Sequence, residues 1–219
     1  MVSSAGEQPT RYRRVVDGLV LPVAIATHPA LDFCNTLAGW NEPEPHDYLA
    51  TYTHLVVWAR ETGLVDARST TRALDGAEDD PRGATRQLAR ARSLRSALHA
   101  ACTGPTSEAA WDAVVTEARA AASQAVLRRD GAPGRRWSIS PAVGLERPVL
   151  ELAREAADLL ACTDLRHVRA CPGANCGWLF ADPSGRRRWC TMEVCGNRAK
   201  VRRHAERQRA ARAVDRRAG

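Results

Sequence analysis

The stretch CPGANCGWLFADPSGRRRWCTMEVCGNRAK, residues 171–200, decides how the C-terminal part of this chain folds. It contains four of the seven cysteines, with four residues inside each pair and thirteen residues between the two pairs. Thiolates supplied as two local pairs are typical of a structural zinc site, in which the tetrahedral ion keeps no open position for water or substrate. We therefore predict one structural zinc ion per chain, held by Cys171, Cys176, Cys190 and Cys195.

The spacing of the second pair predicts where the last helix begins. In a regular helix, residues five apart point about 140° away from each other. Cys190 and Cys195 can therefore share a metal only if the residues between them form a turn or an interrupted helix, and we expect a regular helix after Cys195. The neighbouring aromatic residues could stack on exposed bases, but we expect a module this small to use them as its core. These residues are Trp178, Phe180 and Trp189.

The C-terminal quarter of the chain is strongly basic. Residues 166–219 contain fourteen Arg or Lys and four acidic residues, whereas residues 1–165 contain eighteen Arg and twenty-one acidic residues. A basic helix without an apolar stripe is often a solvated tail, but here a metal-fixed turn and the SGRRRW segment concentrate the charge. We predict that DNA is the partner. The expected contacts are Arg186, Arg187, Arg188, Arg198, Lys200, Arg202, Arg203, Arg207 and Arg209.

Residues 1–165 have the apolar periodicity of a mostly helical domain. We expect a helix near residue 31, with Asp47 as the cap of the next helix, and a polar loop over residues 69–83. Further helices are expected within residues 84–102, 105–127 and 146–164, and short strands within residues 14–25 and 137–143. The predicted fold class is α+β: a mostly helical N-terminal domain with a minor sheet, over residues 1–165, and a small zinc module ending in a basic helix, over residues 166–219. We expect the first domain to fold alone.

The composition favours a soluble cytoplasmic protein without a membrane partner. No stretch approaches eighteen consecutive apolar residues, and residues 1–14 lack the apolar core of a secretory signal. An odd number of cysteines, clustered in one region, fits reduced thiols better than a disulfide framework. The remaining cysteines lie in apolar patterns, so we expect Cys34, Cys102 and Cys162 to be small buried residues.

Two motifs resemble known families. CGNRAK at residues 195–200, preceded by RRWC and WLF, resembles the CGNR-type zinc finger, and HPALDFCNTL at residues 28–37 resembles the opening of the ABATE domain, which precedes that finger in related bacterial proteins. The resemblance implies a stress-related transcription regulator. It also implies the same four cysteine ligands, with Gly196, Asn197 and Arg198 completing the finger motif.

Several functional questions remain open at the level of sequence. Asp32 and Asn35 could line a small-molecule effector pocket, or they could cap and turn the chain as it enters a helix. The N-terminal domain could also form a homodimer. Two alternatives to a DNA-binding regulator are an RNA-binding protein and a redox- or metal-responsive zinc protein that acts through a protein partner. Residues 1–165 show no set of nucleophile, base and orienting group and no phosphate loop, so we expect no enzyme and assign no catalytic residue.

Overall fold

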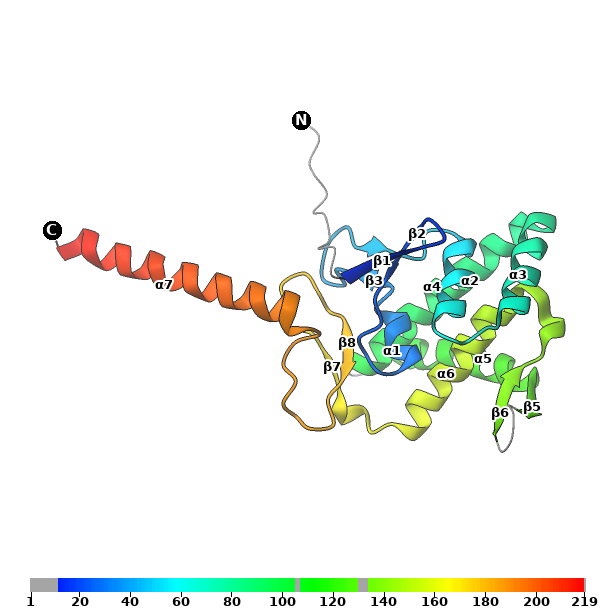
Figure 1. Cartoon of the computed structure of the whole chain (residues 1–219). Coiled ribbons are helices and arrows are strands. Elements are labelled where there is room, and N and C mark those ends of the chain that lie inside the picture. Colours follow the sequence, from blue (N-terminus) through cyan, green and yellow to red (C-terminus); the bar gives the residue numbers. More distant parts are fainter. Residues whose placement is uncertain (1–11, 105–106, 130–133, 219) are drawn as a thin grey trace.

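The computed structural model of the protein describes residues 12–104, 107–129 and 134–218, with the backbone alone for residue 135 and residues 210–218. The described part is mostly helical, as Figure 1 shows. Its strands form four antiparallel two-stranded sheets. The main helices are α1 (Pro29–Cys34), α2 (Tyr52–Glu61), α3 (Ala67–Asp79), α4 (Pro81–Thr103), α5 (Glu108–Ser123), α6 (Arg147–Cys162) and α7 (Asn197–Ala218). Short helical turns are η2 (Pro141–Glu146), η3 (Leu165–His167) and η4 (Met192–Gly196). The strand pairs are β1 (Arg13–Val16) with β2 (Leu19–Pro22), β3 (Leu37–Ala38) with β4 (His46–Asp47), β5 (Ala125–Arg129) with β6 (Arg135–Ile139), and β7 (Val168–Ala170) with β8 (Leu179–Ala181).

Helix α4 forms the centre of the helical body and contacts α1, α2, α3, α5 and α6. Its buried face includes Leu88, Ala91, Leu94 and Leu98, at the three- and four-residue spacing that an amphipathic helix requires. Figure 1 shows that these helices cluster together, while α7 projects away from them. In the described part of the chain, no helix is both long enough and apolar enough to cross a membrane.

Asp47 does not cap helix α2, contrary to the expectation from the sequence. Helix α2 begins at Tyr52, and the side chain of Thr51 accepts the capping hydrogen bond. Asp47 instead forms a bidentate ion pair with Arg95 of α4, with both N–O distances at 2.7 Å. The Arg95 side chain is only 3% exposed, and a buried positive charge is stable only when it is paired. Asp47 supplies the negative charge that pairs with it.

The polar stretch over residues 69–83 is also not a loop. It forms most of helix α3 and the start of α4. The Asp66 side chain caps α3 by accepting from the Ser69 N–H, and the Asp80 side chain caps α4 by accepting from the Gly83 N–H. Two successive acidic caps therefore produce two helices from a segment whose composition is typical of a loop.

The helical body and the cysteine-rich region share their apolar core across the expected boundary at residues 165 and 166. Val168 and Leu179 belong to the same buried cluster as the helices, and Tyr12 and Tyr48 belong to the cluster that contains the four cysteines. The Asn35 side chain pairs with the backbone of Leu179 in both directions, at 2.7 and 2.9 Å. These contacts argue against independent folding of residues 1–165.

Replacing Asp47 by Asn should destabilise the protein by about 3 kcal/mol at neutral pH, because it leaves the buried Arg95 charge unpaired. Burial by itself raises the pKa of Asp47, but Arg95 outweighs burial and holds the pKa below its usual range. The Asp47 contribution is therefore present above about pH 4 and is lost as the pH falls through the lower folded-state pKa. Urea unfolding at several pH values measures both effects.

The matched control is Asp158→Asn, because Asp158 pairs with Arg154 and its side chain is 58% exposed. An exposed pair contributes about 0–1 kcal/mol. Equal losses in the two variants, or a loss at Asp47 that does not shrink in acid, would contradict the proposed role of the Asp47–Arg95 pair.

A chain that ends at Leu165 should expose the apolar surface that β7 and β8 cover, and it should bind a hydrophobic dye and self-associate. A chain that ends at Asn197 keeps the shared core and lacks only α7, so it should stay monodisperse. Dye fluorescence and sedimentation velocity of the two proteins compare these states. A well-folded, dye-free protein ending at Leu165 would restore the expectation of two independent domains.

Candidate metal centre and basic surface

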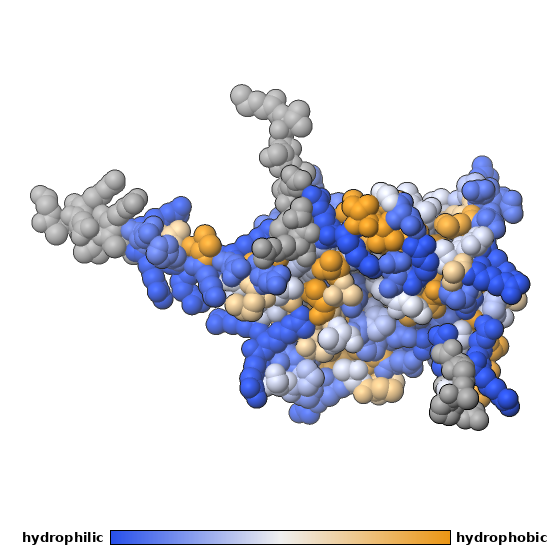
Figure 2. Space-filling model, viewed as in Figure 1, coloured by the Kyte–Doolittle hydropathy of each residue, from blue (hydrophilic) through white to orange (hydrophobic). Residues whose placement is uncertain are grey.

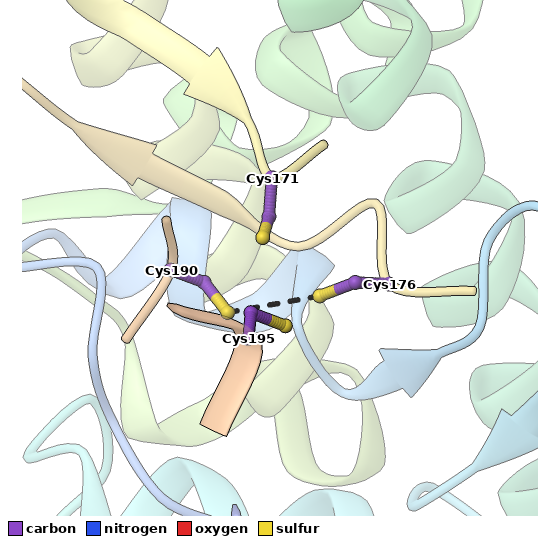
Figure 3. Close-up of side chains that lie close together, drawn as sticks. All are labelled: Cys171, Cys176, Cys190 and Cys195. Carbon is purple, nitrogen blue, oxygen red and sulfur yellow. Dashed lines mark hydrogen bonds between the residues drawn. The ribbon is translucent and has the colours of Figure 1, made fainter. Parts of the chain in front are cut away.

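The four cysteines predicted from their spacing lie together in the structure. Cys171 follows β7, Cys176 and Cys190 lie on loops either side of β8, and Cys195 lies in η4. Their sulfur atoms all lie within 4.8 Å of one another, and all four residues are buried. Figure 3 shows that the four thiols point toward a common centre, with the Cys176 and Cys190 sulfurs 3.7 Å apart.

The chain around the cysteines has little room for side chains. A Cβ atom at Gly173 would lie 2.8 Å from the Cys195 sulfur, closer than such atoms approach. Gly177 has a φ of +70°, and a Cβ atom there would meet Trp40 at 2.6 Å. Glycine at these two positions allows the loop to close around the sulfurs and against the helical body.

The turn between Cys190 and Cys195 confirms that a regular helix starts only after the last ligand. Residues Met192–Gly196 form η4, a single turn of π-helix, and α7 begins at Asn197. The wider turn brings Cys195 back toward Cys190, which a regular helix would not do. The local distortion therefore places the fourth sulfur in the cluster.

The cluster fits a structural zinc ion. Four sulfurs at about 2.3 Å from one tetrahedral ion lie about 3.8 Å apart, which is close to the 3.7 Å between the Cys176 and Cys190 sulfurs and compatible with the 4.8 Å that bounds all four. Four buried sulfur ligands also leave no position for a substrate, so the ion would hold the chain in place rather than take part in a reaction. The residues present thus form a site for one structural zinc, as the sequence predicts.

The aromatic residues next to the cysteines form a small core. Trp178 is 2% exposed and Phe180 is 1% exposed, so neither ring is available to stack on a base. Trp178 also donates from its indole nitrogen to the Leu37 carbonyl, at 2.9 Å. Trp189 is partly buried against the same cluster. The prediction of a packing role is confirmed for Trp178 and Phe180.

The three arginines of the SGRRRW segment differ in their surroundings. Arg186 and Arg188 are exposed, but the Arg187 guanidinium donates to the carbonyls of Ile25 and Cys190 and lies 4.5 Å from the centre of the Phe180 ring. Arg187 therefore has a structural role in this conformation, whereas the exposed Arg188 guanidinium lies 5.8 Å from the centre of the Trp189 ring.

Asp182 organises the loop that carries these arginines. Its buried carboxylate accepts from the backbone N–H groups of Arg186 and Arg187 and from the Ser184 hydroxyl. Burial opposes ionisation of Asp182, but these hydrogen bonds outweigh it and hold its pKa below the usual range. The loop is thus shaped around a carboxylate that is ionised at neutral pH.

Helix α7 presents the remaining predicted basic contacts to solvent. None of residues 197–209 is buried, and their basic side chains are exposed. Figure 2 shows that the described part of this helix is mostly hydrophilic. Arg202 lies 3.9 Å from Glu206, and this contact is itself exposed. The exposed basic residues of α7 are Arg198, Lys200, Arg202, Arg203, Arg207 and Arg209.

Asp32 and Asn35 take part in the local structure of the chain. The Asp32 carboxylate accepts from the backbone N–H groups of Ile25 and Ala26, at 2.8 and 2.9 Å. Asn35 is occupied by its two hydrogen bonds to Leu179. A cavity of about 690 Å³ lies between α5, α6 and β6, and neither residue lines it. These contacts favour the capping and turning role over an effector pocket around Asp32 and Asn35.

The three cysteines outside the cluster differ in their exposure. Cys34 is buried, as predicted, whereas Cys102 is half-buried and Cys162 is exposed.

Tyr12 is an unexpected neighbour of the metal centre, because its hydroxyl lies 3.0 Å from the Cys190 sulfur. The two residues are 178 positions apart, so no local pattern in the sequence could have joined them.

Comparison with protein families gives two matches. A model of the ABATE family, described as "Putative stress-induced transcription regulator", matches residues 27–163. A model of the CGNR zinc finger matches residues 167–208. A search among curated proteins found no match.

The purified protein should contain one zinc ion per chain, and Cys190→Ser should reduce the zinc content to well below half. Because the cysteines share a core with the helical body, zinc removal should also lower the melting temperature of the whole protein. Elemental analysis and calorimetry measure the two effects. Cys162→Ser, at an exposed cysteine outside the cluster, serves as the control and should keep its zinc. Full zinc occupancy in Cys190→Ser would contradict the ligand assignment.

Proposed function

The chain belongs to the ABATE family and carries a CGNR zinc finger, and from this premise we propose that it is a transcription regulator that binds duplex DNA through the finger and α7. The observation that carries the proposal is α7 itself. It is a helix of 22 residues with no buried side chain among its described positions, and it is attached directly to the metal centre. Its long exposed surface and positive charge suit a polyanion.

The basic residues of α7 lie on two sides of the helix. At about 100° per residue, Arg198, Arg202 and Arg209 share one side, and Lys200, Arg203 and Arg207 share a nearly opposite side. The major groove of B-DNA is about 12 Å wide and admits one helix, with a phosphate backbone along each wall. A helix in the groove can therefore use both basic sides at once, one on each strand.

The sector between the two basic sides has a different chemistry. It carries Val201, His204 and Gln208, and the last two contact each other at 2.9 Å. Val201 is 70% exposed, although it is apolar. In the groove this sector would face the base edges, where a glutamine amide can pair with adenine and an apolar side chain can contact the thymine methyl group. Glu206 lies on the opposite sector, away from the DNA.

The geometry favours DNA over the alternative partners. The major groove of an RNA duplex is deep and narrow, so it does not admit a helix in this way. A protein partner would be expected to use an apolar patch, and Val201 is the large apolar side chain that the described part of α7 exposes. We propose a binding role without catalysis, because the four buried cysteines suit a structural zinc ion and the exposed side chains of α7 are mostly basic.

Binding to duplex DNA should weaken as salt rises, with a slope of log K against log salt of about −4 to −5 if four to six side chains neutralise phosphates. The double variant Arg198→Ala, Arg202→Ala should reduce the size of this slope by about two, because each lost phosphate contact removes about one. Fluorescence anisotropy at several salt concentrations measures the slope for a duplex of mixed sequence.

The matched control is Arg68→Ala, Arg72→Ala, which removes the same charge from two exposed arginines four residues apart on α3. This variant should keep the slope of the unmodified protein. A second control is the chain that ends at Asn197, which keeps the cysteine cluster and lacks α7. If that chain binds duplex DNA with unchanged affinity and slope, α7 is a solvated tail and the proposal fails.

A further inference from the structure

Tyr12 lies against the metal centre although it precedes both matched regions, which cover residues 27–163 and 167–208. Its hydroxyl oxygen is 3.0 Å from the Cys190 sulfur and 3.1 Å from the Cys195 sulfur. The residue is only 3% exposed. Its ring packs on Trp178 with centroids 4.7 Å apart. The hydroxyl is therefore placed between two sulfurs and shielded from water.

The surroundings of Tyr12 direct its hydroxyl proton toward sulfur. The Thr191 hydroxyl donates to the Tyr12 oxygen at 3.5 Å, so the oxygen already serves as an acceptor. Zinc-bound thiolates have no proton and accept only, so Tyr12 must be the donor in the metal-loaded protein. The backbone is fixed as well, because the Tyr12 carbonyl accepts from the Val23 N–H at 2.9 Å.

A hydroxyl that donates to the thiolates of a buried zinc site stabilises their negative charge. A zinc ion with four thiolates would carry a net charge of −2 among four buried ligand residues. Hydrogen bonds to the sulfurs spread this charge and orient the ligands, and loss of such outer contacts typically lowers metal affinity 10- to 100-fold. Tyr12 also extends from the β1–β2 hairpin, so the same contact joins the N-terminal segment to the finger.

We propose that Tyr12 is a positioning residue of the zinc centre, which shares its single phenolic proton between the Cys190 and Cys195 thiolates in one bifurcated hydrogen bond and ties the β1–β2 hairpin to the metal. The assignment is independent of DNA binding, since it concerns only the metal centre and the chain that covers it.

The test is Tyr12→Phe in the full chain, which keeps the ring on Trp178 and removes only the hydroxyl. Tyr48→Phe is the matched control, because Tyr48 is buried in the same cluster and its hydroxyl has no hydrogen-bond partner among the described residues. Competition with a chromogenic chelator should show about tenfold weaker zinc binding for Tyr12→Phe. Tyr48→Phe should bind zinc like the unmodified protein.

A spectroscopic measurement separates the hydrogen bond from a general loss of packing. With cobalt in place of zinc, the sulfur-to-cobalt charge-transfer band should move to longer wavelength in Tyr12→Phe, because a thiolate without its donor releases electron density more easily. Tyr48→Phe should leave the band unchanged. Should Tyr12→Phe fold poorly, the unmodified zinc protein still provides a test, since its Tyr12 hydroxyl proton should exchange slowly with solvent by NMR. Unchanged affinity and an unchanged band in Tyr12→Phe, equal effects in both tyrosine variants, or a rapidly exchanging hydroxyl proton would each overturn the proposal.

Discussion

Four thiolates in a buried cluster repel one another, and only a cation at their centre makes the arrangement stable. This constraint organises the C-terminal quarter of the chain. Cys171 and Cys176 close the loop between β7 and β8, and Cys190 and Cys195 fix the turn from which α7 departs. Trp178 and Phe180 fill the small core beside them. Without the metal, this loop-rich segment would have too little apolar surface to fold by itself.

The metal centre packs directly against the helical body, although these two parts of the chain match different family models. Asn35 pairs with the backbone of Leu179 as a neighbouring strand would, and so supplies partners for an otherwise open edge of β8. Trp40 stacks on His99 and packs against Gly177. The boundary between the families is thus a boundary in sequence, while the hydrogen bonds and the core run across it. We therefore expect zinc loading to affect the stability of the helical body.

Local patterns were sufficient for some features of this protein and insufficient for others. The cysteine spacing identified the cluster, and the apolar periodicity identified α4, α5 and α6, because both depend on nearby residues. The sequence places Asp47 at a helix cap because its partner, Arg95, lies on another helix. SGRRRW predicts three equivalent arginines, since nothing in it indicates that the Arg187 side chain donates to the Ile25 carbonyl. Long-range contacts leave no periodic signal, so the sequence does not reveal the position of Tyr12 either.

The single π-helical turn of Met192–Gly196 has a mechanical consequence. Helix α7 is about 33 Å long at 1.5 Å per residue, and it is joined to the body through this one turn. A small change in the turn at Cys195 would therefore displace the far end of α7 by a larger distance. A rotation of about 10° at Cys195 would move the far end of the helix by about 6 Å, which is more than the helical pitch of about 5.4 Å. A zinc ion that holds Cys190 and Cys195 would therefore restrict the direction in which the far end of α7 points.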